Sequence, residues 1–468
     1  MRITIIGAGF SGCALALQLA DTRDDAVEVC VAGVPATFGR GVAYGEARPE
    51  HLLKVRARHL GIDPDNPDDF AEWLNLSTRA RDAFLPRIAY GEYLHDRILT
   101  TREQSSNLSF FEHEVIAIER EPQGFRVFLA DGSDFASDCV VLALGALPPQ
   151  RLAGVGPRLA RHARYIGWPW HEEALDRIQP DERVLIIGTG LTMADVVTSL
   201  HKRGHRGEIV ALSRHGLLPL RHLPEAPAPI RLPPSVLHAL RTRDVRRLLA
   251  AVRSLACAVP DWRSVVDALR PHTQAFWQGL PAVQRARFLR HLRTYWEACR
   301  HRLAPRVAAE LDLLAVSGQL QVRAGRLLRA GLREDGVDVV IRHRFRKQTS
   351  VERFDRLVRA TGLDTDITRT THPLVTHMLD AGLVRADAHG LGIMVDDGLG
   401  VLDASGFTIP GLYCLGPLLR GHLWEITAVQ ELRTAAGALA QRLLEGDPCA
   451  DRPRLPAWPW RADADRSG

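Results

Sequence analysis

Apolar residues along the chain alternate between short continuous runs and stretches with helical spacing. Residues 2–6 form an apolar run that predicts a buried strand, and residues 13–20 have the small, apolar side chains of a buried helix. The same order recurs about 180 residues later, where residues 183–187 predict a strand and residues 191–200 a helix. A further strand is expected after each helix, at residues 27–31 and 208–212. Strands that alternate with helices indicate parallel, doubly wound sheets.

Two longer segments also resemble each other. Residues 111–145 and 320–362 each predict two strands joined by a glycine turn, a polar break and a buried strand that ends at a glycine. We interpret both as β-meander crossovers that return to the sheets. Between residues 233 and 306 the apolar spacing changes to three and four, which predicts a helical insertion. The predicted fold class is therefore α/β, with two Rossmann-like domains, β-meander crossovers and a helical insertion.

A glycine-rich turn joins the first predicted strand to its helix. Gly7, Gly9 and Gly12 satisfy the GxGxxG pattern, in which the first glycine permits a tight turn, the second lets the backbone approach a pyrophosphate and the third lets the helix pack closely on the strand. Phe10 and Ser11 lie within this turn, and the free N–H groups at the N-terminus of the helix that follows favour a bound phosphate. We predict that this turn binds a dinucleotide; the alternative is a tight turn without a ligand.

The strand that follows this turn lacks the acid that normally contacts an adenosine ribose. Ala32 occupies the expected position, and Glu28 comes too early to replace it unless the register differs. The pyrophosphate contact is therefore expected, whereas the residue that contacts the ribose is left open.

The second turn repeats the first in part. Gly188 and Gly190 are present, although Met193 stands where a third glycine is expected. The next strand ends at Ser213 and Arg214, which offer a hydroxyl and a guanidinium where an acid would select NADH. Because Arg214 can form paired hydrogen bonds with a 2′-phosphate, NADPH is expected in preference to NADH. The alternative for Arg214 is an exposed arginine at a strand end.

Composition and cysteine content exclude several classes of protein. The 468 residues are 46% hydrophobic and 25% charged, as in soluble globular proteins, and no apolar stretch is long enough to span a membrane. The formal charge of +5 is modest, so no nucleic-acid partner is expected. Seven scattered cysteines without a CxxC pair argue against a disulfide framework, a zinc ribbon and a redox-active dithiol. We expect a cytoplasmic protein without a metal site.

Several motifs resemble those of a known group. The chain is similar to bacterial FAD/NAD(P)-binding proteins that include the FAD-dependent urate hydroxylases, over about residues 1–445, in the segments 38–45 (FGRGVAYG), 51–55 (HLLKV), 69–74, 86–94, 188–195, 295–305 and 422–429. The resemblance implies a two-dinucleotide-domain fold like that of flavin-containing monooxygenases, with FAD in the first domain and NAD(P)H in the second.

The resemblance also suggests site residues. Beside the two turns, it implies cofactor contacts by Arg40, Gly145, Gly416 and Glu425. The segment 424–427 is expected to begin a helix whose N-terminus faces the flavin, where its dipole would stabilise the reduced ring. In related segments the residue at Lys54 is often asparagine, so a role near the flavin does not simply carry over. Lys54 is a candidate catalytic residue, and Arg56 and Arg58 are candidates for binding an anionic substrate; the alternative is a set of basic surface residues.

The domains follow from these interpretations. We expect residues 1–165 to form the first part of the FAD-binding domain, residues 180–350 the NAD(P)H-binding domain with the insertion, and residues 351–446 the return to the first domain. Residues 447–468, rich in proline, tryptophan and charge, are expected to form a surface strap or a partly disordered tail.

The leading functional hypothesis is a monooxygenase that uses NADPH, FAD and molecular oxygen to oxygenate a small molecule. The resemblance makes the hydroxylation of urate to 5-hydroxyisourate, a step of purine degradation, the most concrete choice. One alternative is an NAD(P)H-dependent flavin reductase that passes electrons to a quinone or protein acceptor. Others are N- or Baeyer–Villiger-type oxygenation of an amine or ketone, and a non-catalytic dinucleotide-binding scaffold. The oligomeric state is left open.

Overall fold

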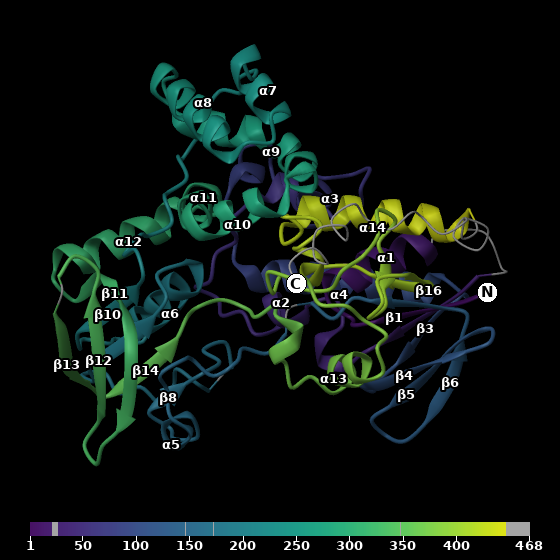
Figure 1. Cartoon of the computed structure of the whole chain (residues 1–468), viewed down its shortest axis with the longest axis horizontal. Coiled ribbons are helices and arrows are strands. Elements are labelled where there is room, and N and C mark those ends of the chain that lie inside the picture. The colour runs from purple at the N-terminus through teal and green to yellow at the C-terminus, as the bar shows by residue number, and fades with distance from the viewer. Residues whose placement is uncertain (21–26, 146, 172, 347, 446–468) are drawn as a thin grey trace, which may run out of the picture.

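The computed structural model describes residues 1–20, 27–145, 147–171, 173–346 and 348–445. Within these ranges, two sheets with their helices lie side by side, and the helices α7, α8 and α9 rise above them (Figure 1). The predicted α/β class with two Rossmann-like units and a helical insertion is confirmed. The expected tail at residues 447–468 lies outside the described residues.

The first sheet has the strand order β15-β16-β7-β1-β2-β3. All neighbouring strands run parallel except β15 and β16. Most positions of β1, β2 and β7 are buried, as expected when helices cover both faces of a parallel sheet. α1 (Phe10–Ala20) packs against both α4 (Arg87–Gln104) and α14 (Val429–Leu444). The strands are β1 (Arg2–Ile6), β2 (Glu28–Ala32), β3 (Leu108–Phe111), β7 (Cys139–Leu142), β15 (Gly400–Leu402) and β16 (Thr408–Cys414).

The second sheet has the order β13-β12-β11-β10-β9-β14-β8. Its central strands β14-β9-β10-β11 repeat the arrangement of β7-β1-β2-β3 in the first sheet. α6 (Leu191–Lys202) follows β9, and α12 (Pro305–Val316) leads into β11. The strands are β8 (Tyr165–Ile166), β9 (Val184–Ile187), β10 (Ile209–Ser213), β11 (Leu320–Leu332), β12 (Val337–His343), β13 (Thr349–Phe354) and β14 (Arg356–Arg359).

The expected domain boundary at residue 351 needs correction, because it falls inside the second sheet. β13 pairs with β12, and β14 pairs in parallel with both β9 and β8. The return to the first domain therefore comes after β14. Leu147 and Asp364 form an antiparallel bridge, which shows that the outward and return connections run next to each other.

The two β-meanders differ in how they join their sheets. β4 (Val115–Glu121), β5 (Gly124–Leu129) and β6 (Asp134–Ser137) form a separate three-stranded sheet, against which α13 (Pro373–Asp380) packs. In the second domain β11 is continuous: its first half pairs in parallel with β10 and its second half antiparallel with β12.

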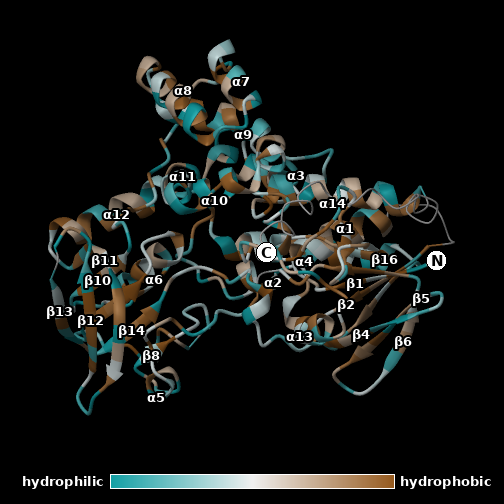
Figure 2. Ribbon diagram, in the orientation of Figure 1, coloured by the Kyte–Doolittle hydropathy of each residue, from teal (hydrophilic) through white to brown (hydrophobic). Residues whose placement is uncertain are grey.

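The insertion is helical over the predicted range. Its helices are α7 (Pro234–Arg241), α8 (Val245–Ala258), α9 (Trp262–Gly279), α10 (Ala282–His291) and α11 (Arg293–Arg300). They carry hydrophobic and hydrophilic residues on the same helix, whereas the central strands of both sheets are mainly hydrophobic (Figure 2). Val236, Val265 and Leu269 form a small core of their own. No helix in the described ranges is long and apolar enough to cross a lipid bilayer.

Short helices complete the connections. They are α2 (Gly41–Gly45), α3 (Asp69–Trp73) and α5 (Pro157–Ala160), with 3₁₀ turns at Pro35–Thr37, Ala57–His59, Ala80–Asp82, Ile367–Arg369 and Pro417–Leu419.

Candidate cofactor and substrate sites

The three glycines of the first turn have different structural roles. Gly7 has a φ of 112°, and a Cβ there would collide with the carbonyl oxygen of Ala143. A Cβ on Gly12 would collide with the carbonyl oxygen of Gly7. By contrast, a Cβ on Gly9 would make ordinary contacts with the backbone of Gly41, at 3.4 Å from its Cα. Gly7 and Gly12 therefore serve the packing of strand and helix, whereas Gly9 keeps the backbone open at the N-terminus of α1.

The segment 39–41 covers this turn and brings Arg40 to it. The amide of Gly39 donates a hydrogen bond to the carbonyl of Ala8 over 2.9 Å. One Nη of Arg40 donates to Glu92 over 2.9 Å, while its buried Nε has no acceptor among the described residues. The backbone of Gly39 and Gly41 thus lies against the turn, and the unpaired N–H of Arg40 is a donor that suits an anionic group such as a dinucleotide pyrophosphate.

The segment after β16 passes over the start of α1. Gly416 has a φ of 112°, and a Cβ there would lie 3.0 Å from the hydroxyl oxygen of Ser11. The expected helix start at residues 424–427 is wrong, because α14 begins at Val429. Glu425 is buried and faces the insertion: it accepts a hydrogen bond from the indole of Trp296 over 2.8 Å and pairs with Arg300 over 3.1 Å. Those contacts come from packing between distant segments, which a local pattern does not reveal.

The second turn reproduces the first at the level of single atoms. Gly188 has a φ of 121°, and a Cβ there would collide with the carbonyl oxygen of Ala360, as at Gly7 and Ala143. A Cβ on Gly190 would meet nothing within 4 Å. Gly145 and Gly362 each lie two residues after those alanines, have φ of 70° and 80°, and face open space. Gly362 was not predicted as a site residue, although the repeat of residues 111–145 in 320–362 was signal enough to find it.

The end of β10 carries more positive charge than the sequence indicated. Arg214 is exposed, and its carbonyl accepts a hydrogen bond from Arg344 over 2.9 Å. Arg344 also contacts the ring of His215. Burial lowers the pKa of His215, and the positive charges of Arg344, Arg214 and Arg326 lower it further. Arg344 comes from the loop between β12 and β13, far along the sequence, and was therefore missed.

Ser213 and Ala32 lie at the ends of corresponding strands. The hydroxyl of Ser213 accepts hydrogen bonds from the amide of Gly216 over 3.0 Å and from the hydroxyl of Thr189 over 2.8 Å, which shapes the loop. β2 ends at Ala32, in the expected register, and Glu28 lies at its other end, paired with Arg2 over 2.9 Å. Four residues of strand span about 13 Å, so Glu28 does not replace the missing acid.

Lys54 lies at the interface of the two domains. Its ammonium pairs with Asp195 of α6 over 3.0 Å, and Arg87 pairs with the same carboxylate over 2.7 Å. Burial raises the pKa of Asp195, but Arg87 and Lys54 outweigh that effect and hold it at about 2. Burial lowers the pKa of Lys54, because it disfavours the charged ammonium group. The contact positions the loop around Lys54 against α6, and its predicted catalytic role stays a prediction.

Arg56 and Arg58 also make contacts within the protein. Arg56 is buried and donates to the carbonyl oxygens of Asp82 (2.7 Å), Leu223 (3.1 Å) and Pro224 (3.0 Å). Arg58 pairs with the Asp82 carboxylate over 3.2 Å. Both arginines lie in the same loop as Lys54. Their guanidinium groups bind neighbouring segments of the protein. Their predicted binding of substrate is not tested by these contacts.

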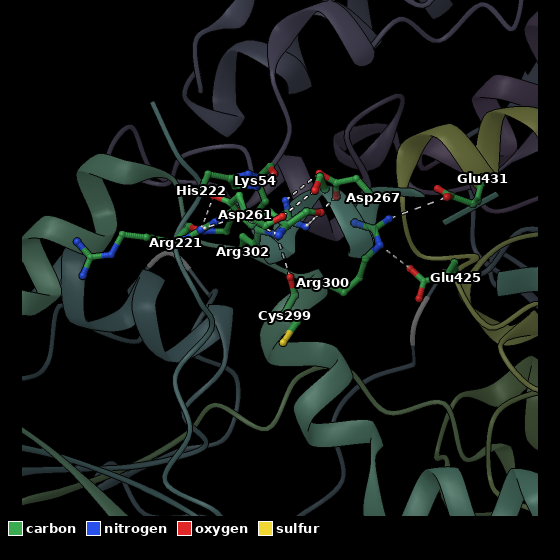
Figure 3. A network of polar contacts seen from close by, with 12 residues as sticks. Lys54, Arg221, His222, Asp261, Asp267, Cys299, Arg300, Arg302, Glu425 and Glu431 are labelled. Atoms are coloured by element: carbon green, nitrogen blue, oxygen red, sulfur yellow. Dashed lines mark hydrogen bonds and ion pairs between the residues drawn. The ribbon is translucent and has the colours of Figure 1, made fainter. Parts of the chain in front are cut away.

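A polar network joins this loop to the insertion and to the C-terminal segment (Figure 3). His222 bonds to the carbonyl of Lys54 over 3.1 Å, and Arg302 pairs with Asp267 of α9 over 2.7 Å. Arg300 points toward Glu425 and Glu431. The carboxylate of Glu431 also accepts hydrogen bonds from Nε and one Nη of Arg270, over 2.6 and 2.7 Å. These contacts fix the insertion over the region where the two domains meet.

Among the described residues, no cluster of His, Cys, Asp and Glu has the arrangement of a metal site. No disulfide joins the cysteines in the described part of the chain, and burial raises the pKa of Cys13 and Cys414 to about 12, which leaves both as protonated thiols.

Comparisons with known proteins agree with the two-domain dinucleotide-binding fold. A model of the FAD-NAD(P)-binding family matches residues 4–147. The search of curated proteins gives no match. Three solved structures each align with 95% of this chain. The ornithine N-hydroxylase of Kutzneria sp. 744, with reduced FAD, NADP⁺ and L-ornithine, has a TM-score of 0.63 at 17% identity over 98% of its length.

The other two are also amine monooxygenases. The FAD-bound cadaverine monooxygenase of Erwinia amylovora has a TM-score of 0.65 at 14% identity over 94% of its length. The L-lysine 6-monooxygenase of Pseudomonas syringae has a TM-score of 0.61 at 18% identity over 99% of its length. The chain has the fold of flavin-dependent amine monooxygenases. Membership of the urate hydroxylases is not shown by these comparisons.

Proposed function

We propose that this protein is an NADPH- and FAD-dependent monooxygenase that N-hydroxylates a small primary amine. The observation that carries the proposal is the pair of matching glycine turns: Gly9 and Gly190 stay open, while Gly7 and Gly188 are closed by carbonyl oxygens of equivalent alanines. Two such turns in one chain provide for two dinucleotides. FAD, when bound, accepts hydride from NADPH and supplies the electrons that activate oxygen.

The first turn is the proposed FAD site. Its free helix N–H groups, the unpaired Nε of Arg40 and the close approach of Gly416 to Ser11 provide a donor-rich and compact surface for a pyrophosphate. A Cβ on Gly145, after the end of β7, would meet nothing within 4 Å, so this residue leaves open space at the end of the strand.

The second turn is the proposed NADPH site. Arg344 contacts both His215 and the backbone of Arg214, and the charges of Arg214, Arg326 and Arg344 all lower the pKa of His215; no ion pair to a carboxylate is found for these arginines among the described residues. Like charges held this close favour a bound anion, and a 2′-phosphate is the group that distinguishes NADPH from NADH at such a strand end. We therefore infer that these arginines recognise the 2′-phosphate.

The substrate is proposed to lie under the insertion, next to the network of Arg300 and Glu425. N-hydroxylation requires the lone pair of a neutral amine. Two histidines of this region have lowered pKa values. Burial and then the charge of Arg300 lower the pKa of His301 to about 4, and burial and then Arg302 lower that of His222 to about 4. A bound amine meets the same burial and positive charge, which favour its neutral, reactive form.

The insertion also excludes water from this region. Trp424 lies 4.8 Å from Trp277 and 5.2 Å from Phe288, measured between ring centroids, and the three rings form one buried cluster. A dry site keeps the electrons of the reduced cofactor from being lost as peroxide.

The test is a screen of NADPH consumption by the purified protein with L-ornithine, L-lysine, cadaverine and urate, followed by mass spectrometry. We expect one of the amines to accelerate NADPH consumption and to gain one oxygen atom. Acceleration by urate with formation of 5-hydroxyisourate would instead support the urate hydroxylase resemblance. Consumption that depends on a quinone and not on oxygen would identify a reductase, and protein that purifies without flavin would favour a scaffold.

A further inference from the structure

A cavity of about 440 Å³ lies between the two domains, away from both glycine turns. α6 and α12 of the second domain form one side, and the segments 49–52 and 82–86 of the first domain form the other. Thr198 on its wall is eight residues from Gly190 along α6, which corresponds to about 12 Å of helix. No residue of either glycine turn lines the cavity.

Two polar groups on the cavity wall have no hydrogen-bond partner in the described part of the chain. Thr198 is 3% exposed, and its hydroxyl oxygen is buried and unpaired. One carboxylate oxygen of Glu310, on α12, is likewise buried and unpaired. Buried polar groups are almost always paired in folded proteins. Both residues line the cavity, so these two atoms lie just behind the surface that a ligand would contact.

The cavity wall carries equal numbers of carboxylates and cations that form no ion pairs in the described part of the chain. Glu50 and Glu310 provide two carboxylates, and Lys202 and Arg306 provide two cations. Within the described ranges, none of these four residues takes part in an ion pair, although Glu50 accepts a hydrogen bond from Ser199 over 2.7 Å. A third acid on the wall, Asp82, is already paired with Arg58 over 3.2 Å.

The remaining wall is apolar. Leu52, Phe84 and Pro86 come from the first domain, and Ala304 and Val307 from the second. A ligand that matches this wall carries one positive group, one negative group and a hydrophobic body.

We propose that this cavity binds a zwitterionic amino acid with an apolar side chain. Its ammonium group would pair with Glu310 and Glu50, its carboxylate with Arg306 and Lys202, and its side chain would pack against Phe84. Because the walls come from both domains, the ligand bridges them. Binding here does not depend on the oxygenation chemistry and can be measured without turnover.

Isothermal titration calorimetry on the full-length protein tests this proposal with L-leucine, L-phenylalanine and L-tryptophan as probes. We expect at least one of them to bind with a stoichiometry of one. For L-leucine, 4-methylpentanoate lacks the ammonium group and 3-methylbutylamine lacks the carboxylate. Each analogue should bind at least ~10-fold more weakly than its parent amino acid, because each loses a charge-assisted contact. Absence of binding by all three amino acids, or equal binding of the analogues, would overturn the proposal.

Variants locate the binding. Arg306→Ala and Glu310→Gln should each weaken amino-acid binding at least ~10-fold. Arg253→Ala is the matched control, because Arg253 is also an exposed helix arginine but lies on α8, outside the cavity. Affinity that is unchanged in both cavity variants would place the ligand elsewhere and refute the site. Should a variant fail to fold, the comparison of analogues on the unmodified protein still decides the outcome.

Discussion

At the residue scale, the two glycine turns separate residues that the fold requires from residues that a ligand requires. A side chain at Gly188 would collide with the carbonyl of Ala360, whereas a side chain at Gly190 would point into open space. We therefore expect Gly190→Val to fold normally and keep its flavin colour but to lose reduction by NADPH. Gly188→Val should instead lower the yield of folded protein. Stopped-flow flavin reduction and thermal unfolding check the pair. Normal NADPH-dependent reduction in Gly190→Val would contradict the assignment of the second turn.

The first turn makes the equivalent prediction for FAD. Gly9→Val adds a branched side chain where the backbone is expected to meet the pyrophosphate, while its Cβ makes an ordinary contact with Gly41. The variant should therefore purify as folded protein without yellow colour. A folded Gly9→Val protein with full FAD content would show that this turn does not bind the flavin.

Arg214 and Arg344 are predicted to set coenzyme preference. Replacing either by alanine should weaken NADPH binding by about 1.5–3 kcal/mol, roughly 10-fold or more, and NADH binding far less. Arg342, exposed on β12 of the same hairpin, is the matched control, and Arg342→Ala should leave both affinities unchanged. Equal losses for the two coenzymes would rule out recognition of the 2′-phosphate.

The buried cluster of Asp195, Lys54 and Arg87 predicts a pH dependence of stability. The folded pKa of Asp195, about 2, lies below the ordinary value of 3.8, so the unfolded chain takes up a proton first as the pH falls. The contribution of ionised Asp195 to the free energy of unfolding is complete above about pH 4 and disappears toward pH 2. It amounts to about 2 kcal/mol. Urea unfolding at several pH values should show this slope in the unmodified protein and not in Asp195→Asn. Identical slopes would contradict the cluster's role.

At the scale of elements, the docking of the insertion depends on Trp424. This side chain is 4% exposed and packs between the first domain and the rings of Trp277 and Phe288. Trp424→Ala should destabilise the docked state by about 3–5 kcal/mol and speed amide hydrogen exchange in α9, α10 and α11. Phe407→Ala, at a residue that is 52% exposed, is the control. Unchanged exchange in Trp424→Ala would mean that the insertion is held by other contacts.

The elements also show how far local pattern predicts structure. The two strand-turn-helix units and the insertion were predictable, because strands buried on both faces are continuously apolar, the helices of the insertion repeat apolar residues every three or four positions, and glycine marks the turns. The domain boundary was misplaced, since β13 and β14 belong to the second sheet by pairing with strands distant in sequence. The helix start near Glu425 was also wrong, because Trp296 and Arg300 hold that segment through contacts that no local pattern encodes.

At the scale of the whole molecule, the sequence predicts cofactor sites better than substrate sites. A dinucleotide site is built from one local turn, so Gly7, Gly9, Gly188 and Gly190 could be found by spacing alone. The candidate substrate region draws on the loop at Lys54, the insertion and the segment after β16, which meet only in the folded chain (Figure 3). For the same reason Arg344, which reaches the end of β10 from another hairpin, could not be predicted.

The central claim is that electrons from NADPH serve to insert oxygen into a small amine. The most direct test measures, in one reaction with the amine found by the screen, the NADPH consumed, the oxygen consumed and the hydroxylated product formed. Our account predicts equal molar amounts of all three, with little hydrogen peroxide. It would be contradicted if NADPH consumption continued without oxygen, or if the oxygen were recovered as peroxide with no oxygenated product.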